Sequence, residues 1–352
     1  MEKKREIVMS GIRPTGFLHL GNYFGAVRNY VRMQEEYTCY FMVADWHALT
    51  TLNETRELRG HVRRVMAENI ACGLDPSKVA FYCQSHVPET AELYLYLNML
   101  AYKGELEKTP TFKEKVRLQP NNVNAGLLTY PVLMAADILL HRAKLVPVGK
   151  DQGQHLEIAR DFAQRFNQRY GEVFPEPYAF NFGEELIKVP SLDGAGKMSK
   201  SENQMATIYL ADSDDAIRKK IMKAKTESGG GGGAVSKTES GGGAVSKTDA
   251  SGAAMPESVA NLFLLLRLVG GEDAAAGYRE DYDAGTIRYG DMKKELAEKM
   301  VAFIGPIRQK AEAIQEDSVL LEKIMKEGAV KARMSAQETI MMAKKAIGLD
   351  YY

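Results

Sequence analysis

The sequence predicts an α/β protein in which a parallel sheet is followed by a helical C-terminal domain. Through the first half of the chain, short apolar segments alternate with amphipathic segments, as in a parallel sheet whose strands are joined by helices. From Pro256 onward, apolar residues recur at helical spacing while Lys and Glu fill the other faces. The chain has 352 residues, more than one hydrophobic core usually serves, so we expect two domains that meet near residue 205.

The strands expected in the first domain are short and apolar. They lie at 7–9, 38–45, 79–83 and 145–148, and helices are expected at 22–36, 54–71, 89–99 and beyond residue 152. Apolar continuity over 38–45 indicates a strand that is buried on both faces. Residues 104–125 form a polar excursion with an exposed loop in this interpretation, and 127–137 a helix with Pro131 in its first turn.

The second domain is expected to begin with a basic helix at 211–225, whose lysines could face RNA phosphates or only solvent. A Gly-rich direct repeat follows at 231–238 and 241–248, and we expect the whole of 227–254 to be a flexible insert. Further helices are expected at 258–269, stopped by Gly270 and Gly271, at 291–314, kinked or divided near Pro306, and finally up to Gly348.

Composition excludes several classes of protein. Formal net charge is zero, so no overall positive field points to nucleic acid, and any such contact must be local. Cys39, Cys72 and Cys83 are odd in number and lack a C-x-x-C spacing, which favours reduced thiols over disulfides or a zinc site. The sequence shows no secretory segment and no apolar run long enough to span a membrane, so a cytoplasmic location is expected.

The first motif, Pro14 to Asn22, lies between the first expected strand and the following helix. Such a loop delivers its residues to the carboxyl edge of a parallel sheet, and a helix that starts near Gly21 points its backbone N–H groups at an anion. His19 and Asn22 are three apart and could donate hydrogen bonds to a phosphate. Without a Cβ, Gly16 and Gly21 would let a purine or ribose lie against the backbone. His19 could equally be a capping or core histidine, and Gly21 with Asn22 only a helix cap.

The second motif, Lys197 to Ser201, places two lysines three apart around two serine hydroxyls, downstream of Gly194 and Gly196. Lysine is a compact and flexible point charge that can follow phosphate oxygens during a reaction, and the glycines let the loop move at low steric cost. Alone, this motif is better explained by a solvated lysine loop. Together with the first motif it predicts a nucleoside triphosphate site.

Polar residues at the ends of other strands are further candidates. His47 follows the second strand, and Asp151 and Gln152 follow the fourth, where they could bind ribose hydroxyls. Asp151 could instead cap the next helix. Asp137 lies in an apolar helix with Met134 on the same face, and a carboxylate there is costly unless a donor meets it. A ligand N–H or O–H could be that donor, as could backbone N–H groups or an arginine.

Taken in order, the first motif, Gly149-x-Asp151-Gln152 and the second motif resemble the class I aminoacyl-tRNA synthetases. Within that class, residues 126–137 and 146–152 are similar to the bacterial tryptophanyl-tRNA synthetases, and the similarity covers nearly the whole chain apart from the repeat insert. The resemblance implies contacts of ATP with Arg13, Pro14, Thr15, Gly21, Asn22, Gly149, Lys150, Asp151, Gln152, Val189, Lys197, Met198, Ser199, Lys200 and Ser201. It implies catalytic roles for His19, Asn22, Lys115, Lys197 and Lys200, and tryptophan contacts for His47, Tyr130, Met134 and Asp137, the last as acceptor of the indole N–H.

The same resemblance implies a Rossmann-like catalytic domain with a connective segment inserted at about residues 100–145, and a helical domain that meets the tRNA anticodon. It also implies ATP with Mg²⁺ as a substrate complex, no metal held permanently by the protein, tRNA(Trp) as a partner and a homodimer. The expected reaction joins L-tryptophan to AMP with release of pyrophosphate, and then transfers tryptophan to the 3′-terminal adenosine of tRNA(Trp). Because no protein nucleophile is needed, positioning and charge stabilisation supply the catalysis.

Three alternatives stay open at this level. A tyrosine–tRNA ligase would share the fold, and a buried Asp could accept a phenol O–H as readily as an indole N–H. A small nucleotidyltransferase shares the first motif but is shorter and lacks both the lysine motif and the helical domain. A non-catalytic RNA-binding paralogue would be expected to have lost the lysines or the ribose-facing groups, which are intact here.

Overall fold

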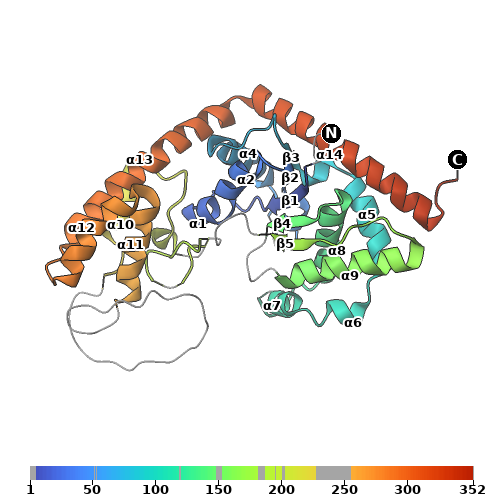
Figure 1. The fold of residues 1–352 in the computed structure, drawn as a ribbon, viewed down its shortest axis with the longest axis horizontal. Helices are drawn as coiled ribbons and strands as arrows, with labels where there is room; N and C mark the ends of the chain where they lie inside the picture. The colour runs from blue at the N-terminus through green and yellow to red at the C-terminus, as the bar shows by residue number, and fades with distance from the viewer. Residues whose placement is uncertain are drawn as a thin grey trace. The chain divides into compact units, whose positions relative to one another are not determined.

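The chain divides into two compact units, neither of which is a continuous stretch of sequence (Figure 1). The computed structural model describes residues 5–50, 52, 54–118, 120–147, 153–180, 187–194, 196–199, 203–226 and 255–351. Unit 1 comprises Met1–Phe17, Ala26–Leu186 and Ala311–Tyr352, and unit 2 comprises Leu18–Gly25 and Ile187–Lys310. The predicted boundary at residue 205 separates a domain that binds ATP and tryptophan from a domain that binds tRNA. This functional division stays a prediction.

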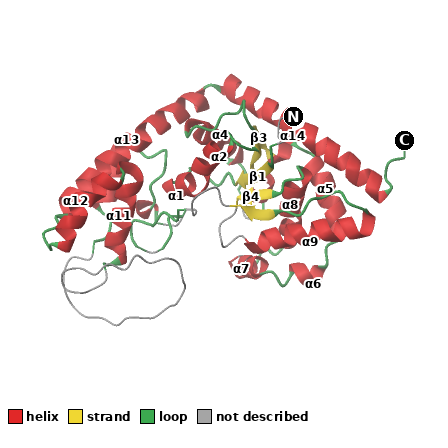
Figure 2. Ribbon diagram, viewed as in Figure 1, coloured by secondary structure: helices red, strands yellow, loops and turns green. Residues whose placement is uncertain are grey.

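Unit 1 is built on a five-stranded parallel sheet with the strand order β3-β2-β1-β4-β5, labelled in Figure 1 and drawn in yellow in Figure 2. The strands are β1 Ile7–Ile12, β2 Thr38–Val43, β3 Ala80–Cys83, β4 Leu145–Pro147 and β5 Tyr178–Phe180. The parallel α/β sheet is confirmed, and because all strands run the same way, their carboxyl ends share one edge. β5 is a strand that the sequence analysis missed, since Tyr178 and Ala179 are exposed and leave no apolar run to recognise.

Helices alternate with these strands in unit 1, as predicted. They are α2 Arg28–Met33, α3 Asp45–Ala48, α4 Leu58–Ala71, α5 Glu89–Asn98, α6 Lys103–Leu106, α7 Pro110–Leu118, α8 Ala125–Leu140, α9 Gly153–Tyr170 and α14 Ser318–Ile347. The expected polar excursion at 104–125 thus contains α6 and α7. Of the helices within the described ranges, none combines the length and apolar content needed to cross a bilayer.

The start of α8 differs from the prediction. Pro131 lies inside this helix and not in its first turn, because α8 already begins at Ala125. Asn124 caps that earlier start, since its side-chain Oδ1 accepts a hydrogen bond from the N–H of Leu127 at 2.9 Å. The apolar run was therefore the middle of a longer helix, and the polar cap preceding it sets where the helix begins.

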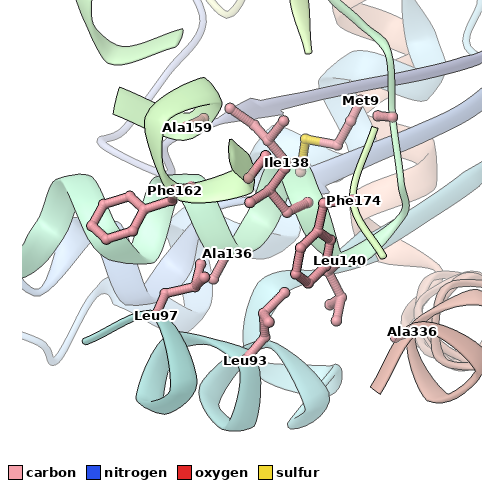
Figure 3. Packing of buried hydrophobic residues seen from close by; sticks show 14 of the residues in the cluster. Met9, Leu93, Leu97, Ala136, Ile138, Leu140, Ala159, Phe162, Phe174 and Ala336 are labelled. Carbon is pink, nitrogen blue, oxygen red and sulfur yellow. The ribbon is translucent and has the colours of Figure 1, made fainter. Parts of the chain in front are cut away.

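The core of unit 1 is made by α5, α8 and α9 together with the sheet and α14 (Figure 3). Buried apolar side chains recur at spacings of three or four residues along α5 and α9, whereas α8 is buried on most of its surface, as expected for a helix with neighbours on several sides. Buried members of this cluster include Met9, Leu93, Leu97, Ala136, Ile138, Leu140, Ala159, Phe162, Phe174 and Ala336. The residue range that carries Asp137 is thus held rigidly from several sides.

The last helix of the chain, α14, packs directly on β3. A Cβ on Gly328 would overlap the carbonyl oxygen of Phe81, so only glycine allows this close approach. Three residues later, Lys331 Nζ donates hydrogen bonds to the carbonyl oxygens of Pro76 and Ser77 at 2.7 and 2.9 Å. These contacts fix both the position of α14 and its rotation about its own axis.

A buried histidine joins the end of α8 to the strands beside it. His141 is 1% exposed, its Nε2 lies 2.8 Å from the Tyr82 hydroxyl, and its ring stacks on Tyr40 with centroids 4.1 Å apart. Its Nδ1 lies 3.3 Å from the Ser335 hydroxyl of α14. Burial lowers the pKa of His141 to about 3, so this ring is neutral at physiological pH and acts as a packing and hydrogen-bonding group.

Unit 2 combines a short N-terminal segment with a group of helices. Its elements are α1 Leu20–Asn22, α10 Asp214–Met222, α11 Glu257–Gly270, α12 Glu272–Asp283 and α13 Tyr289–Glu316, whose last residues belong to unit 1. Gly271, with φ of 84°, follows α11 where the sequence predicted the stop. α13 is one helix with Pro306 inside it, so it is not divided there. The Gly-rich repeat predicted to be flexible lies outside the described residues.

Candidate active site

The Asp137 side chain carries a buried carboxylate, at 2% exposure. Gln84 Nε2 donates to both of its oxygens, at 2.8 Å to Oδ1 and 3.0 Å to Oδ2. His47 Nε2 lies 2.7 Å from Oδ2. Burial raises the pKa of the Asp137 carboxyl, and the hydrogen bond from His47 opposes that increase. Two side chains hold the carboxylate, where the sequence analysis considered backbone N–H groups or an arginine.

These partners come from neighbouring strand ends at the carboxyl edge of the sheet. His47 lies in α3, immediately after β2, and Gln84 opens a 3₁₀ turn immediately after β3. Gln84 also accepts from the backbone N–H of His47 through Oε1, at 3.4 Å. Asp45 joins the same two strand ends, because it accepts from the backbone N–H of Ser85 at 3.0 Å. The arrangement directs the Gln84 amide and the His47 ring toward the Asp137 carboxylate.

One face of α8 carries the other predicted tryptophan contacts. Tyr130, Met134 and Asp137 follow each other at spacings of four and three, which places them on the same side of the helix. Tyr130 is 7% exposed and Met134 is half-buried. His47 adds the fourth predicted contact through its hydrogen bond to Asp137. In unit 1, Tyr130 and Met134 therefore lie on the helix face that carries the Asp137 carboxylate, and His47 bonds that carboxylate directly.

Lys115 of α7 lies beside this face of α8. Its Nζ is 3.7 Å from the centre of the Tyr130 ring, within the range of a cation–π contact. Burial, assisted by the nearby Arg13 guanidinium, lowers the pKa of Lys115 to about 8. Arg13 is exposed just after β1, where the backbone N–H of Thr15 donates to its carbonyl oxygen at 2.9 Å and turns the chain around Pro14. Two predicted phosphate ligands from distant parts of the sequence are thus close in space.

The last five residues of the first motif, Leu18 to Asn22, belong to unit 2. His19 is 6% exposed and precedes α1, and its backbone N–H donates to Asn22 Oδ1 at 3.0 Å. The capping role considered for these two residues is present, and the Asn22 amide NH₂ is the group with donors for a phosphate. A Cβ on Gly21 would lie 2.9 Å from His19 Nδ1 and 3.3 Å from the Met198 carbonyl oxygen. Glycine is therefore needed where the first motif contacts the second.

The second motif follows one arm of a short hairpin. The Met198 N–H donates to the Val189 carbonyl at 2.7 Å, and the Ser191 N–H donates to the Gly196 carbonyl at 2.9 Å. Gly196 has φ of 98°, a conformation that favours glycine at this turn. Met198 is 3% exposed and anchors the arm, while Lys197 and Ser199 on either side of it are exposed. Alternation along an extended arm accounts for this pattern.

The predicted site residues fall into three groups. Unit 1 contains Arg13, Pro14, Thr15, His47, Lys115, Tyr130, Met134 and Asp137, and unit 2 contains His19, Gly21, Asn22, Val189, Lys197, Met198 and Ser199. Gly149, Lys150, Asp151, Gln152, Lys200 and Ser201 lie outside the described residues. Across the parts of the chain that the structure describes, no three His, Cys, Asp or Glu side chains form a group that could hold a metal ion.

Gln84 is a site residue that the sequence analysis missed. It is completely buried and bonds both Asp137 and His47. The signal was available, because Gln84 follows the third expected strand just as His47 follows the second. Polar residues at that strand end were not considered, and the adjacency of β2 and β3 becomes visible only in the sheet order.

Comparison with known proteins gives full-length relatives. The model of the class I tRNA synthetases for tryptophan and tyrosine matches residues 1–305. A tryptophan–tRNA ligase of Porphyromonas gingivalis is 51% identical over 344 residues, which cover 97% of this chain and 99% of the relative. A tryptophan–tRNA ligase of Clostridium perfringens is 40% identical over 357 residues, which cover 99% of each chain.

Solved structures agree with these relatives. The crystal structure of tryptophanyl-tRNA synthetase from Campylobacter jejuni, complexed with ADP and tryptophan, matches with a TM-score of 0.81 at 34% identity and covers 97% of this chain and 99% of that chain. Tyrosyl-tRNA synthetase from Aeropyrum pernix matches with a TM-score of 0.63 at 19% identity and covers 92% and 89% of the two chains, which is a likeness of fold alone. The predicted Rossmann-like fold and the predicted resemblance are both confirmed.

Proposed function

The chain belongs to the class I tRNA synthetases for tryptophan and tyrosine, and we propose how its residues perform the reaction of a tryptophan–tRNA ligase. The activity is ATP-dependent ligation of L-tryptophan to tRNA. In the first step a carboxylate oxygen of tryptophan attacks the α-phosphorus of ATP and pyrophosphate leaves. The product of this step is tryptophanyl-adenylate. In the second step, a ribose hydroxyl of the 3′-terminal adenosine of tRNA(Trp) attacks the carbonyl carbon of the adenylate, the hydroxyl loses its proton, and AMP leaves.

The buried Asp137 carboxylate is the observation that supports tryptophan as the amino acid. Ionised carboxylate oxygens have about four positions for accepting hydrogen bonds, and Gln84 and His47 occupy three of them. We assign the remaining position to the indole N–H. Met134 and Tyr130, one and two turns earlier on α8, would pack against the indole. Selectivity would follow because a ligand without a matching donor leaves the carboxylate incompletely paired.

The cations of the two motifs are assigned to the phosphates of ATP. Arg13, Lys115, Lys197 and the Asn22 amide NH₂ are the groups that would bind them. Charge that builds on the leaving pyrophosphate is stabilised by these groups only in the transition state, which lowers the barrier to the chemical step. ATP would enter as its Mg²⁺ complex, in which the metal neutralises part of the phosphate charge. The other predicted ATP contacts keep the roles given above.

The wider assembly is also proposed from the family. The helical region 206–352 would meet the anticodon of tRNA(Trp), and two chains would form a homodimer. Ribosomes consume the charged tRNA, so we expect the enzyme to act in the cytoplasm.

Exchange of labelled pyrophosphate into ATP tests the function directly. We expect exchange that depends on tryptophan and is at least about 100-fold slower with tyrosine at equal concentration, since a hydrogen-bonding pocket of the wrong shape discriminates strongly. Exchange with tyrosine alone would keep the chemistry and overturn the assignment of Asp137. Absence of exchange with either amino acid would contradict the ligase activity.

The depressed pKa of Lys115 predicts a pH limit for ATP use. As the pH rises through about 8 this lysine loses its charge, so kcat/KM for ATP should fall roughly tenfold per further pH unit if the cation is required. The profile of kcat/KM reports the free enzyme, in which the pKa is depressed. In Lys115→Arg the side chain keeps its charge at every accessible pH, so the fall in kcat/KM above pH 8 should disappear. Lys113→Arg, an exposed change on the same helix, should leave the profile unaltered. A bend near pH 8 that persists in Lys115→Arg would exclude Lys115 as its cause.

A further inference from the structure

Behind the described part of the second motif, Lys197–Ser199, a hydrogen bond holds the backbone in place. The side-chain Oγ1 of Thr207 donates to the carbonyl oxygen of Ser199 at 2.7 Å. Thr207 is 1% exposed, whereas Ser199 itself is exposed. A buried hydroxyl thus fixes one end of the hairpin arm that carries the second motif. The backbone of the same arm is bonded to the opposite arm at Val189.

The residues that follow Thr207 are paired with the first motif. The Leu20 N–H donates to the Ile208 carbonyl at 2.9 Å, and the Leu210 N–H donates to the Leu18 carbonyl at 2.8 Å. These bonds form a short antiparallel pairing on either side of His19. Thr207 therefore stands at the point where one segment of backbone contacts both motifs.

A buried ion pair supports Thr207 from the other side. Lys220 of α10 is 7% exposed, and its Nζ donates to the Thr207 carbonyl oxygen at 2.9 Å. The same Nζ donates to both oxygens of Asp212, at 2.8 and 2.6 Å. Because the lysine charge is desolvated, all three acceptors are needed to stabilise it, and the position of Thr207 is coupled to that of Asp212.

α13 continues this chain of contacts. Arg308 donates to the backbone carbonyl of Asp212 at 2.5 Å and to Asp214 Oδ1 at 2.7 Å. The guanidinium side chain is 14% exposed, so the bond to the carbonyl is largely shielded from water. One continuous path then leads from Arg308 through Asp212, Lys220 and Thr207 to the second motif, entirely within unit 2.

We propose that Thr207 is a positioning residue for the activation step. Its hydroxyl fixes the carbonyl oxygen of Ser199, and the fixed backbone directs Lys197 toward the phosphates. The Lys220–Asp212 pair and Arg308 hold Thr207 in place. The inference rests on the proposed phosphate role of Lys197. It adds a residue that contacts no substrate and acts through the backbone of the motif.

Removal of the hydroxyl tests this proposal. Thr207→Val keeps the shape and loses the donor, while Thr207→Ser keeps the donor and loses a methyl group. We expect kcat for tryptophan-dependent pyrophosphate exchange to fall about five- to tenfold in the valine variant, as for loss of one hydrogen bond that matters in the transition state. The KM for tryptophan should stay unchanged, and serine should restore most of the rate. If the valine variant fails to fold, Thr207→Ala compared with Thr207→Ser isolates the same hydroxyl.

The controls separate this inference from the function on which it depends. Thr339→Val removes another buried threonine hydroxyl that donates to a backbone carbonyl, Ser335 at 3.1 Å in α14, and should leave kcat unchanged. Equal kcat in the valine and serine variants at position 207 would overturn the positioning role. If Lys197→Ala lowers kcat while Thr207→Val does not, only the inference fails. If Lys197→Ala has no effect, the phosphate role itself fails.

Discussion

An Asp137→Asn variant is expected to show a KM for tryptophan about 100-fold above the wild-type value, equivalent to about 2.7 kcal/mol, with a nearly unchanged KM for ATP. Oδ2 of Asp137 accepts from both Gln84 and His47, so the single amide oxygen of asparagine would take that position and the NH₂ group would replace Oδ1. The new NH₂ group would then face the indole N–H, and two donors would meet where a donor and an acceptor are needed. Kinetics of pyrophosphate exchange at varied tryptophan concentration measure the effect.

A matched substitution shows whether the effect is local. Asp161→Asn makes the same chemical change on the exposed face of α9 and should leave the KM for tryptophan within about twofold of wild type. The melting temperature of Asp137→Asn must be recorded as well, because this side chain is buried with two partners. A variant that stays folded and keeps the wild-type KM for tryptophan would exclude Asp137 as the indole acceptor.

Replacement of Lys197 by alanine is expected to lower kcat for activation by about 100- to 1,000-fold, the usual range for one group that stabilises transition-state charge. Tryptophan binding should change little, because the lysine is assigned to phosphate charge that develops only as pyrophosphate leaves. Because Lys197 is exposed on the hairpin, we expect the variant to fold with wild-type stability. Single-turnover formation of the adenylate measures the step without product release.

Lys188→Ala provides the control for Lys197→Ala. Lys188 is also exposed and belongs to the opposite arm of the same hairpin, so its removal changes the net charge of the region by the same amount. We expect wild-type activation in this variant. Equal losses in both lysine variants would show that the general positive field matters and that Lys197 has no specific contact.

The parallel sheet and the strand-end position of His47 could be predicted because both depend on local pattern. A buried strand reads as an apolar run, and the residue that follows it must lie at the carboxyl edge. The pairing of Asp137 with Gln84 could not be predicted in this way. It requires the order of the strands in space, and the two residues are far apart in the sequence. Similarly, the start of α8 depended on Asn124, whose capping role is clear only once the helix is seen.

The contact between the two motifs was the harder case. Their order in the sequence, together with the resemblance, predicted one nucleotide site, and the structure brings Gly21 against the Met198 carbonyl. From the sequence, Gly21 is explained by the room it leaves for a ligand, yet its neighbours show that glycine is also required for packing within the protein. The supporting role of Thr207 gave no signal, since an isolated threonine in an apolar segment is typical of any half-buried strand.

The interleaved course of the chain has a consequence for its biosynthesis. Leu18–Gly25 leaves the ribosome early, but the remainder of its unit, Ile187–Lys310, follows only after most of unit 1 has been made. Unit 1 in turn needs α14, whose Gly328 packs on β3, from the far end of the chain. Neither unit can be completed during translation of its first segment. Apolar residues of both units therefore stay exposed until the segments that cover them have been synthesised. Nascent and prematurely terminated chains are therefore the forms most exposed to chaperones and proteases.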